Sequence, residues 1–185
     1  MAKSSNIKWV RTNFVGDLKA MADAGWDVRP EIHLRFDGGC GPENPGGVPT
    51  FGWQLYSVRP SGGDVIDEGW GVCLLHPAVQ RTNNTAEWAG VTDALEYMRR
   101  HKVAARRLTV IGDSMLVLNQ LSRAWGIKKP WLRVLADEAF GHLRHVCVDG
   151  YAVKWVPREQ NTTCHELAAL AFRQECDNPE VRAVG

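Results

Sequence analysis

The chain has 185 residues, of which 44% are hydrophobic and 23% are charged, and this balance is ordinary for a globular protein with a sizeable core. The formal net charge of +1 argues against a protein that wraps nucleic acid by charge alone, although it is compatible with a local basic groove. The five cysteines are scattered without a Cys-x-x-Cys pair, so neither a disulfide framework nor a zinc site is indicated. No window of about 18 apolar residues and no apolar signal core is present, so we expect a cytoplasmic protein with no membrane partner.

Residues 1–30 are expected to form an N-terminal extension. Phe14, Leu18 and Met21 recur at helical spacing, and Gly25 is suited to end a short helix. Pro30 is expected to separate this extension from the domain that follows.

The next segment has the alternating pattern of a strand. Ile32, Leu34 and Phe36 are apolar and the residues between them are polar, so Asp37 is expected on the face opposite the apolar side chains. A loop rich in Gly and Pro and two further strands follow, and the three strands are expected to form an antiparallel meander. The loop covers residues 38–49, and the two strands cover 51–58 and 65–72.

The second half of the chain alternates helical and strand patterns. Thr82 or Asn83 can cap a helix, because a short polar side chain there accepts free backbone N–H groups. An apolar strand ends at Gly112-Asp113, and Ser114 begins another helix. With the elements that follow, this order predicts an α/β fold in which helices flank one mixed sheet. The predicted ranges are 108–111 for the buried strand, 131–145 for a third helix, 151–156 for the last strand and 161–176 for the last helix.

Three acids stand in unusual places. Asp37 lies on a strand that is apolar on one side, Glu87 lies on the apolar stripe of its helix, and Asp113 ends a run that should be buried. A carboxylate that points toward a core is costly unless it is paired or bound to a cation. One acid from a strand, one from a helix start and one from a strand end can converge on a divalent ion. Ligands that are all oxygen suit Mg²⁺ or Mn²⁺.

Each acid also has a purely structural explanation. Asp37 can begin a turn with the glycines that follow it. Glu87 can complete a capping box near its helix start, where acids are favoured. Asp113 can cap the helix that begins near Ser114. The spacing of the acids alone does not decide between these explanations and a metal site.

The three acids lie in short motifs that follow one another along the chain. These are Asp37-Gly38-Gly39 with Asn44-Pro45-Gly46, then Thr82-Asn83-Asn84-Thr85-Ala86-Glu87, then Gly112-Asp113-Ser114, and last Trp155-Val156-Pro157-Arg158-Glu159-Gln160-Asn161 with Glu166-Leu167-Ala168. In this order the motifs resemble the ribonuclease H family, type 1, over about residues 31–173. The resemblance implies a ribonuclease H-like fold with a five-stranded mixed sheet. It also implies a catalytic domain over 31–176, between the extension 1–30 and a C-terminal tail 177–185.

The resemblance implies a function as well. Asp37, Glu87 and Asp113 would be metal-binding catalytic carboxylates that hold two divalent ions, Mg²⁺ or Mn²⁺. The chain would then be an endoribonuclease, expected to act as a monomer, that hydrolyses the RNA strand of RNA–DNA hybrids. The products would carry a 5′ phosphate and a 3′ hydroxyl.

Contacts to the hybrid are implied by the same resemblance. The glycine-rich backbone after Asp37 would approach the RNA 2′-hydroxyls, a contact that separates RNA from DNA, and glycine permits it because it has no Cβ. The residues concerned are Gly38, Gly39 and Cys40 for the 2′-hydroxyls, Thr82 for a DNA phosphate, and Asn44, Asn83 and Asn84 for hydrogen bonds to the hybrid.

A short stretch between two predicted helices contains Trp125, Lys128, Lys129 and Trp131. In some members of the family a basic helix and loop at this place grips the DNA strand, and aromatic and basic side chains can stack on bases and neutralise phosphates. Alternatively, the two tryptophans pack on the core beside an exposed turn. Other tryptophans that fall in predicted strands or the main helix are expected in the core, namely Trp53, Trp70, Trp88 and Trp155.

The chain departs from the family at the fourth active-site position. The family usually has an aspartate two residues before the Leu-Ala pair of the last helix, and this chain has His165. His165 can bind the second metal through a ring nitrogen, which would favour Mn²⁺, and it can also carry a proton. Alternatively Glu166 reaches the site, which needs a shifted helix because adjacent helical residues point about 100° apart. In two further interpretations, His165 is only a polar residue on the helix rim, or the protein is a catalytically weak or inactive module that binds hybrids.

Two other functions compete with the nuclease. A proofreading exonuclease needs an Asp-x-Glu pair on its first strand, where this chain has Asp37-Gly38-Gly39. A purely structural interaction domain would have no reason to retain three inward-pointing acids.

Overall fold

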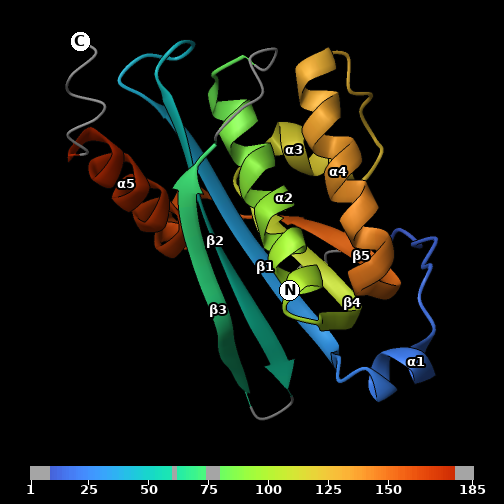
Figure 1. The fold of residues 1–185 in the computed structure, drawn as a ribbon. Coiled ribbons are helices and arrows are strands. Elements are labelled where there is room, and N and C mark those ends of the chain that lie inside the picture. The colour runs from blue at the N-terminus through green and yellow to red at the C-terminus, as the bar shows by residue number, and fades with distance from the viewer. Residues whose placement is uncertain (1–8, 60–61, 74–79, 178–185) are drawn as a thin grey trace, which may run out of the picture.

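The computed structural model describes residues 9–59, 62–73 and 80–177, and Figure 1 shows its fold. Apart from residue 177, the predicted C-terminal tail lies outside the described residues. The predicted order of strands and helices is confirmed. In chain order the elements are α1 (Leu18–Asp23), β1 (Asp27–Gly41), β2 (Val48–Arg59), β3 (Gly62–Val72), α2 (Asn83–Arg100), β4 (Val103–Gly112), α3 (Met115–Leu121), α4 (Pro130–Val146), β5 (Cys147–Trp155), the 3₁₀ turn η1 (Arg158–Gln160) and α5 (Thr162–Asp177).

The strands form one five-stranded sheet in the order β3-β2-β1-β4-β5. Strands β1, β2 and β3 are antiparallel neighbours, whereas β4 runs parallel to both β1 and β5. The predicted meander and the predicted mixed sheet are therefore both correct. Because β1 and β4 are parallel neighbours, their carboxyl ends lie at the same edge of the sheet.

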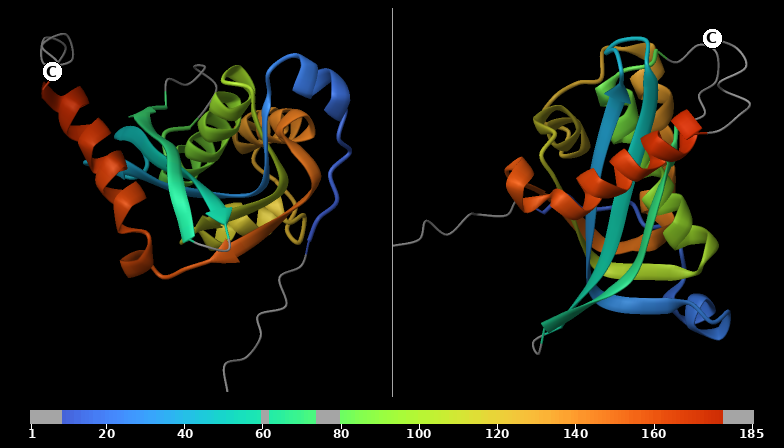
Figure 2. Two further views of the ribbon diagram at one scale, coloured as in Figure 1. Left: turned by 90° about the horizontal axis from the view of Figure 1, so that it is seen from below. Right: turned by 90° about the vertical axis from the view of Figure 1, so that its left-hand side faces the viewer.

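Helices cover both faces of the sheet, as the views in Figures 1 and 2 show. Helices α2 and α4 pack on one face, where Ile32, Leu34 and Phe36 are fully buried. Helix α5 crosses the other face over β1, β2 and β3. No helix within the described ranges is long and apolar enough to cross a lipid bilayer.

The caps of two helices exclude two of the structural explanations for the acids. The Thr82 hydroxyl caps α2 by accepting the Thr85 N–H at 3.2 Å, so the capping-box position is Thr85, and Glu87 lies one half-turn further along. Ser114, and not Asp113, caps α3 through the Val117 N–H at 3.4 Å. The positions of Glu87 and Asp113 therefore need another reason.

The expectation that Pro30 separates an extension from the domain is wrong. Strand β1 begins at Asp27 and runs through Pro30, while Arg29 and Glu31 on either side pair with β4. Proline has no N–H to contribute to a ladder, but the strand continues because its neighbours keep the pairing. Earlier residues also contact the domain, since Val10 bridges Tyr151 of β5.

The expectation that four tryptophans lie in the core is half correct. Trp53 and Trp88 are 2% and 0% exposed, whereas Trp70 and Trp155 are 41% and 51% exposed. Trp70 lies on the edge strand β3, and Trp155 is the last residue of β5. The alternation in a strand separates its two faces, but it does not show whether a helix covers each one.

Candidate active site

The three predicted acids are placed by three neighbouring elements. Asp37 lies near the carboxyl end of β1, and Asp113 directly follows β4 at the same edge of the sheet. Glu87 comes from the second turn of α2. The glycine after Asp37 lets this helix pack closely, because a Cβ on Gly38 would lie 2.3 Å from the backbone nitrogen of Glu87.

Asp37 is a buried carboxylate with few donors. Only 3% of the residue is exposed, and its Oδ1 accepts the Gly38 N–H at 2.9 Å. Burial raises the pKa of Asp37, and the charge of Asp113 raises it further. The carboxylate is therefore held near another carboxylate at a cost in free energy.

Glu87 shows the same conflict more strongly. Burial, with the charges of Asp37 and Asp113, raises the pKa of Glu87 to about 8. A hydrogen bond with Ser114 and the positive charge of Arg158 oppose this shift. The Oε2 atom of Glu87 is buried and has no hydrogen-bond partner. A buried acceptor without a donor is uncommon in folded proteins and indicates a missing partner.

Asp113 is oriented by two residues of the C-terminal motif. The side-chain amide of Asn161 donates to Phe36 O at 2.7 Å and approaches Asp113 Oδ1 at 3.4 Å. The indole N–H of Trp155 donates to the main-chain oxygen of Asp113 at 3.0 Å. Asn161 is 2% exposed, so its buried side-chain amide connects Phe36 of β1 with Asp113, which follows β4.

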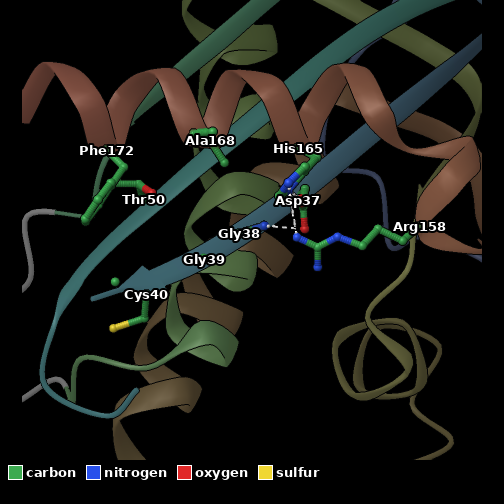
Figure 3. A pocket seen from close by; sticks show the side chains of 11 residues that line it. Asp37, Gly38, Gly39, Cys40, Thr50, Arg158, His165, Ala168 and Phe172 are labelled. Carbon is green, nitrogen blue, oxygen red and sulfur yellow. Dashed lines mark hydrogen bonds and ion pairs between the residues drawn. The ribbon is translucent and has the colours of Figure 1, made fainter. Parts of the chain in front are cut away.

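His165 and Arg158 complete the group around Asp37, and Figure 3 shows both side chains directed toward it. The Nδ1 atom of His165 lies 3.0 Å from Asp37 Oδ2. The Nη2 atom of Arg158 lies 2.9 and 3.2 Å from the two ring nitrogens of His165. If the ring hydrogen is on Nδ1, His165 donates to Asp37 and Nε2 is left to accept from Arg158. Glu166 is exposed and does not line this pocket.

The C-terminal motif contains Arg158, Asn161 and Trp155, but the sequence pattern indicates no role for any of them in the site. The signal was their place in that motif, between the last strand and the last helix. Their contacts with the acids depend on how η1 is placed against the ends of β1 and β4, which no local pattern specifies.

A pocket of about 220 Å³ extends from Asp37 and His165 between the end of β1 and helix α5 (Figure 3). One wall is the glycine-rich backbone that was predicted to meet the RNA strand, and Phe172 of α5 lies at the far end. The predicted substrate residues in this wall are Gly38, Gly39 and Cys40.

The other predicted substrate residues lie at the start of α2. Asn44 Oδ1 accepts the Asn83 N–H at 3.2 Å, which ties the loop after β1 to the first residue of the helix. The Thr82 hydroxyl serves as the helix cap. Asn84 lines a second pocket, of about 550 Å³, with the exposed Trp125. Lys128 and Lys129 also line this second pocket.

The two tryptophans of that stretch behave differently. Trp125 is 51% exposed, whereas Trp131 packs partly on the core with Lys129 Nζ 5.2 Å above its ring. The expectation that both pack on the core therefore holds for Trp131 alone.

The chemistry of the acid group suits a divalent cation. Among residues 9–59, 62–73 and 80–177, no three His, Cys, Asp or Glu side chains lie close enough together to hold a metal ion as they stand. However, Asp37, Glu87 and Asp113 offer only oxygen donors, which is the preference of Mg²⁺ and Mn²⁺. The unpartnered Glu87 Oε2 and the repulsion among the three acids are both relieved by a positive ion.

Comparison with known proteins identifies the family and the fold of the chain. A model of the family described as "Reverse transcriptase-like" matches residues 64–171, which is more than half of the chain. The bifunctional protein Rv2228c of Mycobacterium tuberculosis is 36% identical over 87 residues, a segment that covers 47% of this chain and 23% of that protein. The chain thus spans less than a quarter of the length of this curated relative.

Solved structures show the same fold. The N-terminal RNase H domain of Rv2228c superposes with a TM-score of 0.65 at 27% identity, covering 80% of this chain and 96% of that one. RNase H1 of the archaeon Halobacterium salinarum gives a TM-score of 0.62 at 30% identity, covering 78% of this chain and 98% of that one. LC11-RNase H1, solved with an RNA/DNA hybrid, gives 0.66 at 23% identity, covering 79% and 99%. The chain therefore belongs to the reverse transcriptase-like family and has the type 1 ribonuclease H fold that its motifs predict.

Proposed function

We propose that the chain is an endoribonuclease that hydrolyses the RNA strand of RNA–DNA hybrids with two divalent ions. The observation that carries the proposal is the acid group itself. The charges of Asp37 in β1 and Asp113 after β4 act on Glu87 in α2, and Glu87 retains a buried oxygen without a partner. The fold shared with the RNase H domain of Rv2228c and with the Halobacterium salinarum RNase H1 supports it.

Asp37, Glu87 and Asp113 would hold the ions, with His165 in the fourth position. When bound, such ions activate the attacking water and stabilise the leaving 3′ oxygen at the scissile phosphate. The products would be a 5′ phosphate and a 3′ hydroxyl. Ser114 and Asn161 hold the acids in place through their contacts with Glu87 and Asp113.

His165 is the better candidate for the fourth position than Glu166. Its ring contacts the Asp37 carboxylate at 3.0 Å, whereas Glu166 is exposed on the next position of α5. A ring nitrogen in place of a carboxylate oxygen shifts the preference of a site toward Mn²⁺. His165 would have to exchange its contact with Arg158 for a metal, which leaves the guanidinium free for a phosphate of the RNA strand.

The two strands of the hybrid would lie on different surfaces. The RNA strand would follow the backbone of Gly38, Gly39 and Cys40, where side chains do not obstruct the approach. The DNA strand would lie along the start of α2 and the second pocket. Polar, aromatic and basic groups there are available for phosphates, bases and sugars. They are the Thr82 hydroxyl, the amides of Asn44, Asn83 and Asn84, the exposed indole of Trp125 and the ammonium groups of Lys128 and Lys129.

The test is the cleavage of an end-labelled RNA–DNA hybrid in Mg²⁺ and in Mn²⁺, with RNA and DNA duplexes of the same sequence as controls. We expect the RNA strand of the hybrid alone to be cut, and Asp113→Asn to abolish cutting. Failure of the parent protein to cut the hybrid in either metal, while still binding it, would contradict the proposal.

A second candidate function is a weak or inactive module that binds hybrids, and His165 in the fourth position is the observation that favours it. His165→Asp separates the two functions. If His165 is a metal ligand in an active site, the parent protein is more active in Mn²⁺ and the variant loses this preference. If the protein only binds hybrids, the parent does not turn over in either metal, and only the variant gains activity.

A further inference from the structure

The exposed Trp155 lies next to one of the acids. It is the last residue of β5 and pairs with Gly112, the last residue of β4, immediately before Asp113. Half of the residue is exposed, in contrast to the buried Trp53 and Trp88. Its position at the sheet edge therefore owes little to core packing.

The indole makes one directed contact. Its N–H donates to the main-chain oxygen of Asp113 at 3.0 Å, which fixes the orientation of the peptide that joins Asp113 to Ser114. The second residue of that peptide has two tasks, since Ser114 caps α3 and hydrogen bonds with Glu87. The peptide group between Asp113 and Ser114 thus links Asp113 to Glu87, and the exposed Trp155 donates a hydrogen bond to this peptide group.

We propose that Trp155 is a positioning residue of the active site. Its N–H holds the peptide between Asp113 and Ser114, and through this peptide it sets where the carboxylates of Asp113 and Glu87 stand. The expected effect on cleavage rests on the proposed function. The expected effect on the placement of the two acids does not. A small displacement of a group that acts on a reacting atom lowers the reaction rate by a large factor. Loss of the hydrogen bond that holds the acids in place should therefore lower the rate.

Trp70 provides a matched control for this inference. It is also about half exposed, and its indole N–H donates to Gln174 Oε1 at 3.0 Å. It lies on the edge strand β3, two strands away from β1, and does not line the pocket at Asp37. Phenylalanine at either position keeps an aromatic ring and removes the N–H donor.

The experiment compares Trp155→Phe with Trp70→Phe in two measurements. In hybrid cleavage at saturating metal, we expect Trp155→Phe to lower kcat about tenfold with KM changed less than about twofold, and Trp70→Phe to leave both nearly unchanged. In calorimetric titration with Mn²⁺ and no substrate, we expect Trp155→Phe to weaken binding several-fold and Trp70→Phe to match the parent. Thermal unfolding of both variants confirms that the fold is intact.

Other results would overturn the proposal. If Trp155→Phe retains both the parent kcat and the parent Mn²⁺ affinity, the indole N–H does not position the acids. If Trp155→Phe is normal and only Trp155→Ala raises KM, the ring is a stacking surface for substrate. Failure of the proposed function is seen separately, because the parent protein would not cut the hybrid while the Mn²⁺ titration would still rank the two variants.

Discussion

Helix α2 contributes to two groups of at least partly buried acids that differ in how their charges are met. Toward its middle, Asp93 Oδ2 accepts the indole N–H of Trp53 at 2.6 Å. One turn further along the helix, the Tyr97 hydroxyl donates to Asp67 of β3. Each of these two partly buried acids accepts a hydrogen bond from a neutral donor of its own.

Near the start of the same helix, burial and the charges of Asp37 and Asp113 raise the pKa of Glu87. Donors are scarce there, and Glu87 Oε2 has none. The difference teaches that a buried acid by itself says little about function. Acids that repel one another and lack donors indicate a site that is completed by something outside the chain.

The largest expected effect comes from replacing an acid in the group formed by Asp37, Glu87 and Asp113, here called the crowded group. We expect Glu87→Gln to lower hybrid cleavage by roughly 10³-fold or more, as for the loss of one member of a catalytic set. In EDTA above pH 8, where Glu87 is ionised, the same variant should have a higher thermal midpoint because a source of repulsion is gone, and ~1 kcal/mol corresponds to about 2–4 °C in a chain of this size. An active Glu87→Gln variant, or one that is clearly destabilised, would break the comparison.

The group formed by Asp93 and Asp67, whose acids each accept a hydrogen bond, is here called the satisfied group. A substitution there should lower stability and leave cleavage nearly unchanged. Asp93→Ala leaves the Trp53 N–H without its acceptor, so we expect a loss of about 1–3 kcal/mol in the free energy of unfolding. Cleavage of the hybrid below the unfolding transition should stay within about twofold of the parent. Urea denaturation and the cleavage assay together check this. A folded Asp93→Ala variant that no longer cuts would show that the satisfied group is also part of the site.

A third prediction concerns pH. The pKa of Glu87 is about 8 in the folded protein and near its ordinary value of 4.5 when unfolded, so between these two pH values the folded state retains a proton that the unfolded state releases. This contribution to stability is fully present below pH 4.5 and is lost as the pH rises toward 8. We therefore expect metal-free parent protein to lose stability relative to Glu87→Gln over this range. Parallel stability curves for the two proteins would contradict it.

The smallest effect is expected at His142, which belongs to neither group. Its two ring nitrogens are buried without hydrogen-bond partners, although Nε2 lies 3.9 Å from Glu138 Oε1, and burial lowers the pKa of His142 below 6.5. The neutral ring is therefore favoured in the folded state, and stability is lost as the pH falls below 6.5. We expect His142→Leu to reduce this acid-side loss without changing cleavage. Denaturation of both proteins at pH 5 and pH 7 measures it, and an equal loss in the two would refute it.

The fold was largely predictable because its signals are local. The alternation of Ile32, Leu34 and Phe36 indicated the central strand, and the Thr82 cap marked the start of α2. The placement of Asp37 and Asp113 at one edge follows from β1 and β4 being parallel neighbours.

The remaining features of the site depend on long-range packing. Arg158 and Trp155 reach the acids only because the end of β5 and the turn η1 lie against the ends of β1 and β4. The half-exposure of Trp70 depends likewise on what α5 covers, and a strand pattern does not contain that information. Sequence motifs marked these residues as a group, but they gave no contact between them.

The most direct test of the central claim is the thermal midpoint of the protein measured as Mn²⁺ is added, for the parent, Glu87→Gln and Asp93→Ala. A ligand that binds only the folded state stabilises it by ~2.7 kcal/mol at 100 times its Kd. If the crowded acids are the metal site, Mn²⁺ raises the midpoints of the parent and Asp93→Ala by equal amounts and that of Glu87→Gln by much less. An equal rise in all three proteins would contradict the claim that Glu87 and its neighbouring acids bind the metal.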